Sequence, residues 1–319
     1  MVVVTEEEIA AVESAAHDAL QWPDNCREWS DYNKKQVFRC LFGCSPKIIA
    51  ELWKLIGEID DDKEKSLEEF GAKLEHLLYA LVFLRVYGKN EVVHCAIFGH
   101  PSAKTYRKYS WYFVKKIAHL ENEKYGIIVF DYRYNGDTGN NCLMTIDCLD
   151  CACFEPMAGH EFDHQMYSQK HNGPGLKYKM GVCIHTGHIV WINGPYKAGE
   201  MNDLQVFQDD LCNRLDEDEL VEADKGYMGD AKCKIPQQGI TTVERKQKSV
   251  ARGRHEAVNS LLRDFNVLDT YFHHANEGKE KMFDDHALCF AAVAIITQMK
   301  IRQGDAKTFD VTYDVGYGF

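Results

Sequence analysis

The pattern of apolar residues changes near residue 125, and this change limits the folds open to the chain. Before it, segments such as LEHLLYALVFLRVYG have the length and spacing of helices. After it, CLMTIDCLD, CACFEP, KYKMGVCI and HIVWING are short β-branched or aromatic runs separated by Gly, Asn and Pro, which is typical of strands. NDLQVFQDDLCNRL, VARGRHEAVNSLLRDFNVL and HALCFAAVAIITQMK follow as predicted helices, with ELVEAD as a short buried strand. The order predicts a helical region, residues 1–120, and then an α/β layer domain, residues 121–319.

The composition is that of a globular protein, with 45% hydrophobic and 27% charged residues. We find no run of about 18 apolar residues, so we expect no membrane partner. The N-terminal segment MVVVTEEEIAAVESAAHDAL has no basic region, which argues against secretion. The 12 cysteines lie mostly in apolar runs. We therefore expect reduced, buried thiols in a nuclear or cytoplasmic protein.

The distribution of charge is uneven along the chain. The net charge of −12 argues against nucleic-acid binding over the whole surface. Lysine and arginine are nevertheless concentrated in residues 89–116 and 225–263. Two basic segments in an acidic chain indicate two confined contacts with phosphate groups, although ordinary solvated helix faces would give the same composition.

The segment from about residue 90 to 118 has the features of a helix-turn-helix. The amphipathic segment EVVHCAIFG is followed by Pro101, and Ser102 is a good N-cap for the next helix. Helical spacing places Lys104, Arg107 and Lys108 on one side of that helix and Tyr106, Phe113 and Ile117 on another. We expect the basic side to contact DNA. The alternative is a basic helix in a bundle that touches no DNA.

Three acidic residues occupy positions from which a fold can bring them together. Asp147 interrupts the apolar run LMTI, and Asp224 ends the predicted strand ELVEAD. Glu256 lies on a predicted helix opposite its apolar residues, with Arg252 and Arg263 near it on the same face. Carboxylates converging from distant segments suit Mg²⁺ or Mn²⁺ and the two-metal cleavage of phosphodiesters. Taken singly, each acid could instead be a hydrogen-bonding or surface residue.

Asp203 is an alternative candidate for the second acid of this set. It lies in GEMNDLQVFQDDL, directly before an amphipathic run. This position favours an N-cap, whose carboxylate accepts hydrogen bonds from backbone N–H groups. We therefore prefer Asp224 as the second ligand.

Ordered segments of the chain resemble a known family. TIDCLDCACFEP is similar to the strand that carries the first Asp of Harbinger-type DDE endonucleases. VEADKGYMGD resembles their second-Asp motif, and RHEAVNSLLRDFNVL resembles their glutamate motif. The resemblance extends from about residue 125 to 300, and its specificity lies in the order of the motifs.

The resemblance implies a ribonuclease-H-like mixed sheet flanked by helices and metal-dependent cleavage and transfer of DNA strands. It also implies DNA as partner, together with a homo-oligomer or an accessory DNA-binding protein, and a nuclear location. The spacing Arg252-x3-Glu256-x6-Arg263 resembles the Tyr-x2-Arg-x3-Glu-x6-Lys signature of related transposases, with Ser249 in place of Tyr and Arg263 in place of Lys. Cys148 stands where the family often has Gly.

Three other interpretations remain open from the sequence. The first is a domesticated, catalytically silent DNA-binding protein that retains the fold, although such a protein has no chemical need for the three acids. The second is a structural zinc site formed by Cys151, Cys153, His160 and His164, whose spacing suits zinc. The third is a scaffold that acts through the acidic N-terminal segment.

Overall fold

The chain folds into two compact units in this computed structural model, which describes residues 2–22, 30–59, 65–88, 91–99, 101–136, 141–155, 163–235, 242–274 and 279–306. The first unit contains Met1–Ile127, Arg263–Thr270 and Leu288–Asp305. The second contains Ile128–Leu262 and Tyr271–Ala287. The sequence predicts that every residue after 120 belongs to one domain. The structure instead assigns two later segments to the first unit.

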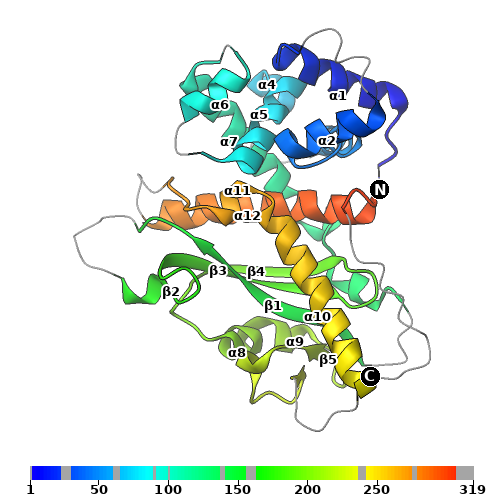
Figure 1. The fold of residues 1–319 in the computed structure, drawn as a ribbon, viewed down its shortest axis with the longest axis vertical. Coiled ribbons are helices and arrows are strands. Elements are labelled where there is room, and N and C mark those ends of the chain that lie inside the picture. The colour runs from blue at the N-terminus through cyan, green and yellow to red at the C-terminus, as the bar shows by residue number, and fades with distance from the viewer. Residues whose placement is uncertain are drawn as a thin grey trace. The chain divides into compact units, whose positions relative to one another are not determined.

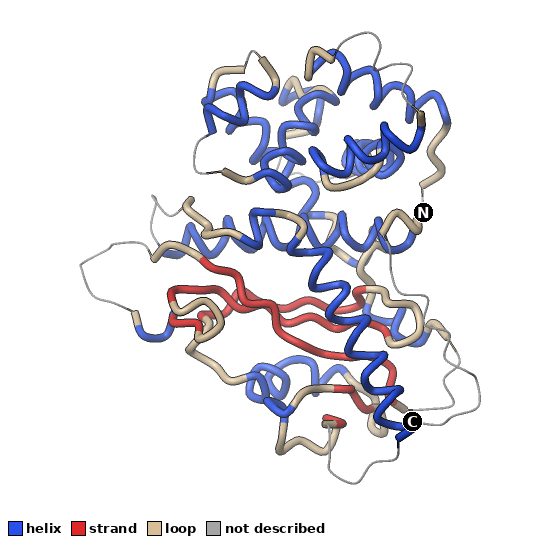
Figure 2. The backbone as a smooth tube through the Cα atoms, viewed as in Figure 1, coloured by secondary structure: helices blue, strands red, loops and turns tan. Residues whose placement is uncertain are grey.

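Within the residues that the structure describes, the regular elements of the first unit are all helices, joined by loops and turns (Figures 1 and 2). Its helices are α1 (Glu6–Ala19), α2 (Asp31–Phe42), α3 (Pro46–Gly57), α4 (Leu67–Phe70), α5 (Leu74–Val86), α6 (Glu91–Ile97), α7 (Ala103–His119), α11 (Asn266–Asp269) and the C-terminal part of α12 (Lys279–Arg302). Local signals set several of their ends. Thr5 forms a capping box at α1, Pro46 is the first residue of α3, and Gly43 ends α2 with φ of 79°.

The C-terminal part of α12 belongs to the core of the first unit. The side chains of residues 292–296 are completely buried. Just after the helix, Asp305 accepts a hydrogen bond of 2.6 Å from Arg39 of α2, and Arg302 donates to the carbonyl of Gly126. A helix that is apolar on all sides carries no periodicity that shows which core it joins. The sequence therefore does not show that Leu288–Asp305 belongs to the first unit.

Residues Glu280–Arg302 of α12 form the one helix, within the part of the chain that the structure describes, that is long and apolar enough to span a membrane. In the structure, 78% of the most apolar 18-residue stretch of this helix is buried. Burial to this extent is typical of a core helix.

The second unit is built on a six-stranded mixed sheet with helices against it. Its strands are β1 (Cys142–Ala152), β2 (Tyr167–Ser168), β3 (Gly173–Cys183), β4 (Ile189–Lys197), β5 (Leu220–Glu222) and β6 (Cys233–Lys234). The order is β2-β3-β1-β5-β6, and β4 also pairs with β3. The β1–β3 and β3–β4 pairs are antiparallel, whereas β1–β5 and β5–β6 are parallel. This is the mixed α/β architecture that the sequence predicts.

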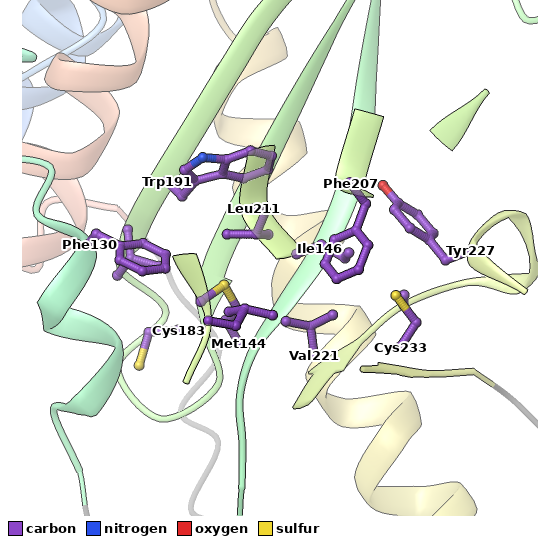
Figure 3. Close-up of a cluster of buried hydrophobic side chains, with 13 residues drawn as sticks. Phe130, Met144, Ile146, Cys183, Trp191, Phe207, Leu211, Val221, Tyr227 and Cys233 are labelled. Atoms are coloured by element: carbon purple, nitrogen blue, oxygen red, sulfur yellow. The ribbon is translucent and has the colours of Figure 1, made fainter. Parts of the chain in front are cut away.

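The two faces of β1 have different partners. Met144 and Ile146 pack with Phe207, Leu211 and other buried apolar side chains in the cluster of Figure 3. These partners come from α8 (Asp203–Val206), the π-helical turn η5 (Phe207–Leu211) and neighbouring elements. On the other face Thr145 contacts α10 (Thr242–Arg263) through a hydrogen bond with His255. Because side chains alternate along a strand, Thr145 and Asp147 lie on the α10 face.

Candidate active site

The register of β1 and β5 brings two of the predicted acids to the same edge. Thr145 pairs directly with Glu222 in the parallel ladder. Asp147 and Asp224 each follow this pair by two residues. Parallel strands that start from one registered pair advance together, so Asp147 in β1 and Asp224, two residues beyond the end of β5, come to the same edge of the sheet.

Each of these aspartates uses one carboxylate oxygen locally. Oδ1 of Asp147 accepts a hydrogen bond of 2.7 Å from the backbone N–H of Cys148. Oδ1 of Asp224 accepts one of 2.8 Å from Gly226, because Asp224 caps the 3-10 turn η6 (Lys225–Tyr227). Both side chains are half-buried. The local bonds fix the orientation of each carboxylate and leave Oδ2 for a ligand.

The third predicted acid, Glu256, comes from α10. Val258 and Leu262 of this helix are completely buried, whereas Glu256 is exposed. The helix is fixed over β1 by the hydrogen bond of 2.7 Å between His255 Nδ1 and Thr145 Oγ1. The predicted orientation of the helix therefore agrees with the structure, and it carries Glu256 to the face of β1 that bears Asp147.

All three acids line one small pocket of the second unit. Its lining residues are Thr145, Ile146, Asp147, Glu222, Ala223, Asp224, Arg252, His255 and Glu256. Arg252 is exposed at this pocket, as expected of a residue that contacts a phosphate. Arg263 is not among the lining residues, and its guanidinium lies 3.4 Å from the carboxylate of Asp269. Of the two arginines expected near Glu256, Arg252 therefore lines the pocket and Arg263 does not.

The sequence patterns did not indicate two residues of the pocket, Glu222 and His255. Glu222 is only 1% exposed and pairs with Thr145 across the strands. His255 is 3% exposed, and burial lowers its pKa to about 4, although the Asp147 carboxylate and the bond with Thr145 raise it. The Glu-x-Asp spacing in ELVEAD could have indicated Glu222, because alternate residues of a strand share a face. No comparable sequence signal existed for His255.

Asp203 does not line this pocket, although its carboxylate and that of Asp224 both lie next to Gly226, and the predicted N-cap is wrong by one residue. Asn202 is the N-cap of α8 and accepts a hydrogen bond of 2.8 Å from Gln205 N–H. Asp203 instead accepts from Lys179 at 2.6 Å and from Lys177 at 3.2 Å. The reason is a long-range ion pair that local capping rules do not include. Asp203 is not among the residues that line the pocket.

The surroundings of Asp203 keep it ionised. Burial raises its pKa, but Lys179, a hydrogen bond from the Cys148 thiol and Lys177 together lower it to about 2. Lys179 is 1% exposed and also donates to Tyr227 Oη at 2.9 Å. Since Tyr227 belongs to the turn that follows Asp224, Asp203 and Lys179 support that turn from the other face of β1.

The donor chemistry of the pocket fits a divalent cation. Asp147, Glu222, Asp224 and Glu256 supply carboxylate oxygens, the ligands that Mg²⁺ and Mn²⁺ prefer. With the side chains as they stand, no group of three His, Cys, Asp or Glu residues in the described ranges is close enough to hold a metal ion. Metal binding therefore requires carboxylates such as that of Glu256, which is exposed, to turn toward the ion.

The structure also places the residues predicted to contact DNA. Lys104, Arg107 and Lys108 are exposed on α7, and Lys108 Nζ lies 4.5 Å from the centre of the Phe70 ring. Ser102 caps this helix by accepting from Thr105 N–H at 3.1 Å, as predicted. The predicted core residues of the helix, Tyr106, Phe113 and Ile117, are completely buried.

The predicted zinc ligands lie only partly within the described residues. Cys151 and Cys153 are buried, and His164 is exposed in the 3-10 turn η4 (His164–Met166). His160 lies outside the described residues. The described cysteines form no disulfide bond, and most of them are buried.

Comparison with known proteins finds a family match for the segment that contains most of this pocket. The family model described as DDE superfamily endonuclease matches residues 146–298. The matched segment contains Asp147, Asp203, Asp224 and Glu256. Comparison with curated proteins and with solved structures gave no significant match.

Proposed function

Because residues 146–298 match the family model described as DDE superfamily endonuclease, we propose that the chain is a transposase-like DNA endonuclease that depends on Mg²⁺ or Mn²⁺. Asp147, Asp224 and Glu256 are the proposed catalytic metal ligands. The sheet and its helices are then the ribonuclease-H-like core that such a domain requires. Cleavage of phosphodiester bonds is the reaction, and joining of DNA strands is its extension in transposition.

The observation that carries this proposal is the meeting of three acids from distant parts of the chain. Asp147 comes from β1, Asp224 from the end of β5 and Glu256 from α10, and all three line one pocket. Clustered carboxylates repel one another unless a cation or a proton compensates their charge. A fold that places them together, with one oxygen of each aspartate already fixed by a backbone N–H group, is well suited to a divalent ion.

The residues at this site have different proposed roles. Divalent ions, when bound, lower the pKa of the attacking water and stabilise charge on the phosphate. Asp147 and Asp224 hold fixed positions at the sheet edge, whereas the exposed Glu256 turns in from α10. Arg252 contacts a phosphate oxygen of the backbone, since a guanidinium offers paired N–H donors.

DNA binding outside the pocket is proposed for α7. Lys104, Arg107 and Lys108 form an exposed basic row, with the opposite side of the helix in the core of the first unit. Such a helix suits contact with the DNA backbone or major groove as part of a helix-turn-helix. A second copy of the chain or an accessory DNA-binding protein would complete the protein–DNA complex.

A catalytically silent DNA-binding protein is the second candidate. It is favoured by one observation: the described side chains form no three-ligand metal cluster as they stand. The two candidates differ in whether the acids still act on DNA.

Nicking of supercoiled DNA separates them. We expect the wild-type protein to convert supercoiled plasmid to the open-circular form with Mg²⁺ or Mn²⁺, and not with EDTA. Asp147→Asn keeps the size of the side chain and removes its charge, so it should abolish nicking. Binding of DNA with no metal-dependent nicking by the wild type would instead support the silent protein.

A further inference from the structure

His255 is held in one orientation by a bond to β1. Its Nδ1 lies 2.7 Å from Thr145 Oγ1, and the same hydroxyl donates to the carbonyl oxygen of Val182 at 3.3 Å. A hydroxyl has one proton to donate. Because Val182 takes that proton, Thr145 accepts from the imidazole, so Nδ1 carries the hydrogen. Nε2 is then the nitrogen with a lone pair.

The lone pair of Nε2 lies in a buried position. His255 is 3% exposed, and Nε2 makes no hydrogen bond to any residue that the structure describes. A buried polar atom without a partner costs about 1–3 kcal/mol. His255 lines the same pocket as Asp147 and Glu256, and the Asp147 carboxylate acts electrostatically on its imidazole, so carboxylates lie near the ring. The lone pair of Nε2 and nearby carboxylates repel one another unless a cation lies between them.

We propose that His255 Nε2 is a nitrogen ligand to the divalent ion of this pocket and makes the site favour Mn²⁺ over Mg²⁺. The inference rests on the proposed metal-dependent function and adds a ligand to the three carboxylates. A histidine ligand with its other nitrogen bonded to a protein acceptor is the usual arrangement in metal sites. Thr145 is that acceptor here.

The nitrogen donor of His255 changes the relative affinity of the site for Mg²⁺ and Mn²⁺. Mg²⁺ demands oxygen ligands and keeps much of its water, whereas imidazole binds transition-metal ions more readily. Affinity at a site with nitrogen and oxygen donors therefore shifts toward Mn²⁺. The adjacent Glu256 is exposed and can adjust its position, but His255 is already fixed, so the histidine sets where the ion lies.

Electron spin-echo spectroscopy of bound Mn²⁺ tests this directly, with protein that carries no histidine tag and with Mn²⁺ alone as the probe. We expect ¹⁴N modulation from a coordinated imidazole in the wild type. Labelling the histidines with ¹⁵N should change that modulation without any substitution in the protein. His255→Asn keeps a donor for Thr145 and removes Nε2, so it should lose the modulation. His286→Gln, at a buried histidine that does not line the pocket, should retain it.

Calorimetry supplies the second measurement. Loss even of an outer partner of a metal ligand costs on the order of 10-fold in affinity. His255→Asn should therefore lose at least that factor for Mn²⁺ and much less for Mg²⁺. Mn²⁺ binding that is abolished by Asp147→Asn but shows no ¹⁴N modulation would overturn the histidine ligand and leave the proposed function standing. No Mn²⁺ binding to the wild type would overturn both.

Discussion

The carboxylate of Asp203 lies 2.6 Å from the ammonium of Lys179, a lysine that is 1% exposed. This pair explains why an acid within the matched family segment stands outside the pocket. The Asp203 side chain compensates a buried positive charge, and its pKa of about 2 keeps it ionised for that purpose. Asp224, with no such partner in the described hydrogen bonds and ion pairs, lines the pocket itself.

Replacement of Asp203 should therefore destabilise the protein. Asp203→Asn leaves Lys179 buried without a counter-ion, and breaking a buried pair in this way costs about 3 kcal/mol. Urea unfolding monitored by circular dichroism measures the free energy of unfolding. Asp224→Asn is the matched control, and it should be neutral or slightly stabilising because it relieves repulsion among clustered acids. Equal stability of the Asp203 variant and the wild type would refute the ion pair as a stabilising contact.

A buried histidine should make the stability of the protein depend on pH. Burial lowers the pKa of His286 to about 3, far below the value in an unfolded chain. As pH falls below about 6.5, the unfolded chain binds a proton that folded His286 does not, so stability decreases toward acid by about 1.4 kcal/mol per pH unit. Above pH 7 neither state binds this proton, and the contribution is fully present.

His286→Gln should reduce the slope of stability against pH by about one proton between pH 6 and 4. Parallel urea titrations at several pH values measure this slope for the variant and the wild type. Comparison at pH 7.5 gives the cost of removing the Tyr178–His286 hydrogen bond of 2.7 Å by itself. Identical slopes would show that folded His286 takes up its proton as readily as the unfolded chain.

The basic row of α7 can be tested through the salt dependence of DNA binding. Replacing Lys104, Arg107 and Lys108 by Ala should weaken binding and flatten the slope of log affinity against log salt by about 0.9 for each phosphate that the variant no longer neutralises. Lys124→Ala, at an exposed lysine outside this helix, is the control. Fluorescence anisotropy over a range of salt concentrations gives both quantities. An unchanged slope in the triple variant would remove α7 from the DNA interface.

Metal binding should appear as a rise in melting temperature. Mn²⁺ binds only the folded pocket, and at 100 times the dissociation constant it stabilises the fold by about 2.7 kcal/mol. Asp147→Ala and Glu256→Ala should abolish the shift, whereas Asp209→Asn, at an exposed acid away from the pocket, should keep it. The same rise in all four proteins would place the ion elsewhere.

The sequence predicts the elements of the site better than their contacts. Asp147 in a strand, Asp224 at a strand end and Glu256 on a helix all follow from local apolar patterns. Glu222 depends on its register with Thr145, and His255 on the rotation of α10 over β1, which are both long-range properties. No local pattern contains them.

One wrong prediction and one feature that the sequence does not show have the same cause. Asn and Asp are both good N-caps, so the sequence could not choose between adjacent residues at α8, and the distant Lys179 decided the role of Asp203. The second concerns α12, whose residues 292–296 are buried on all sides. Its sequence shows that it lies in a core but not which core.

The most direct test of the catalytic site is the rate at which Asp224→Asn nicks supercoiled DNA in Mn²⁺. Asp209→Asn serves as the control for the loss of one acidic charge. We expect the Asp224 variant to fall to the background rate of DNA without protein while its fold stays intact, and the control to match the wild type. Nicking by Asp224→Asn at the wild-type rate would contradict the central claim that Asp147, Asp224 and Glu256 form the catalytic metal site.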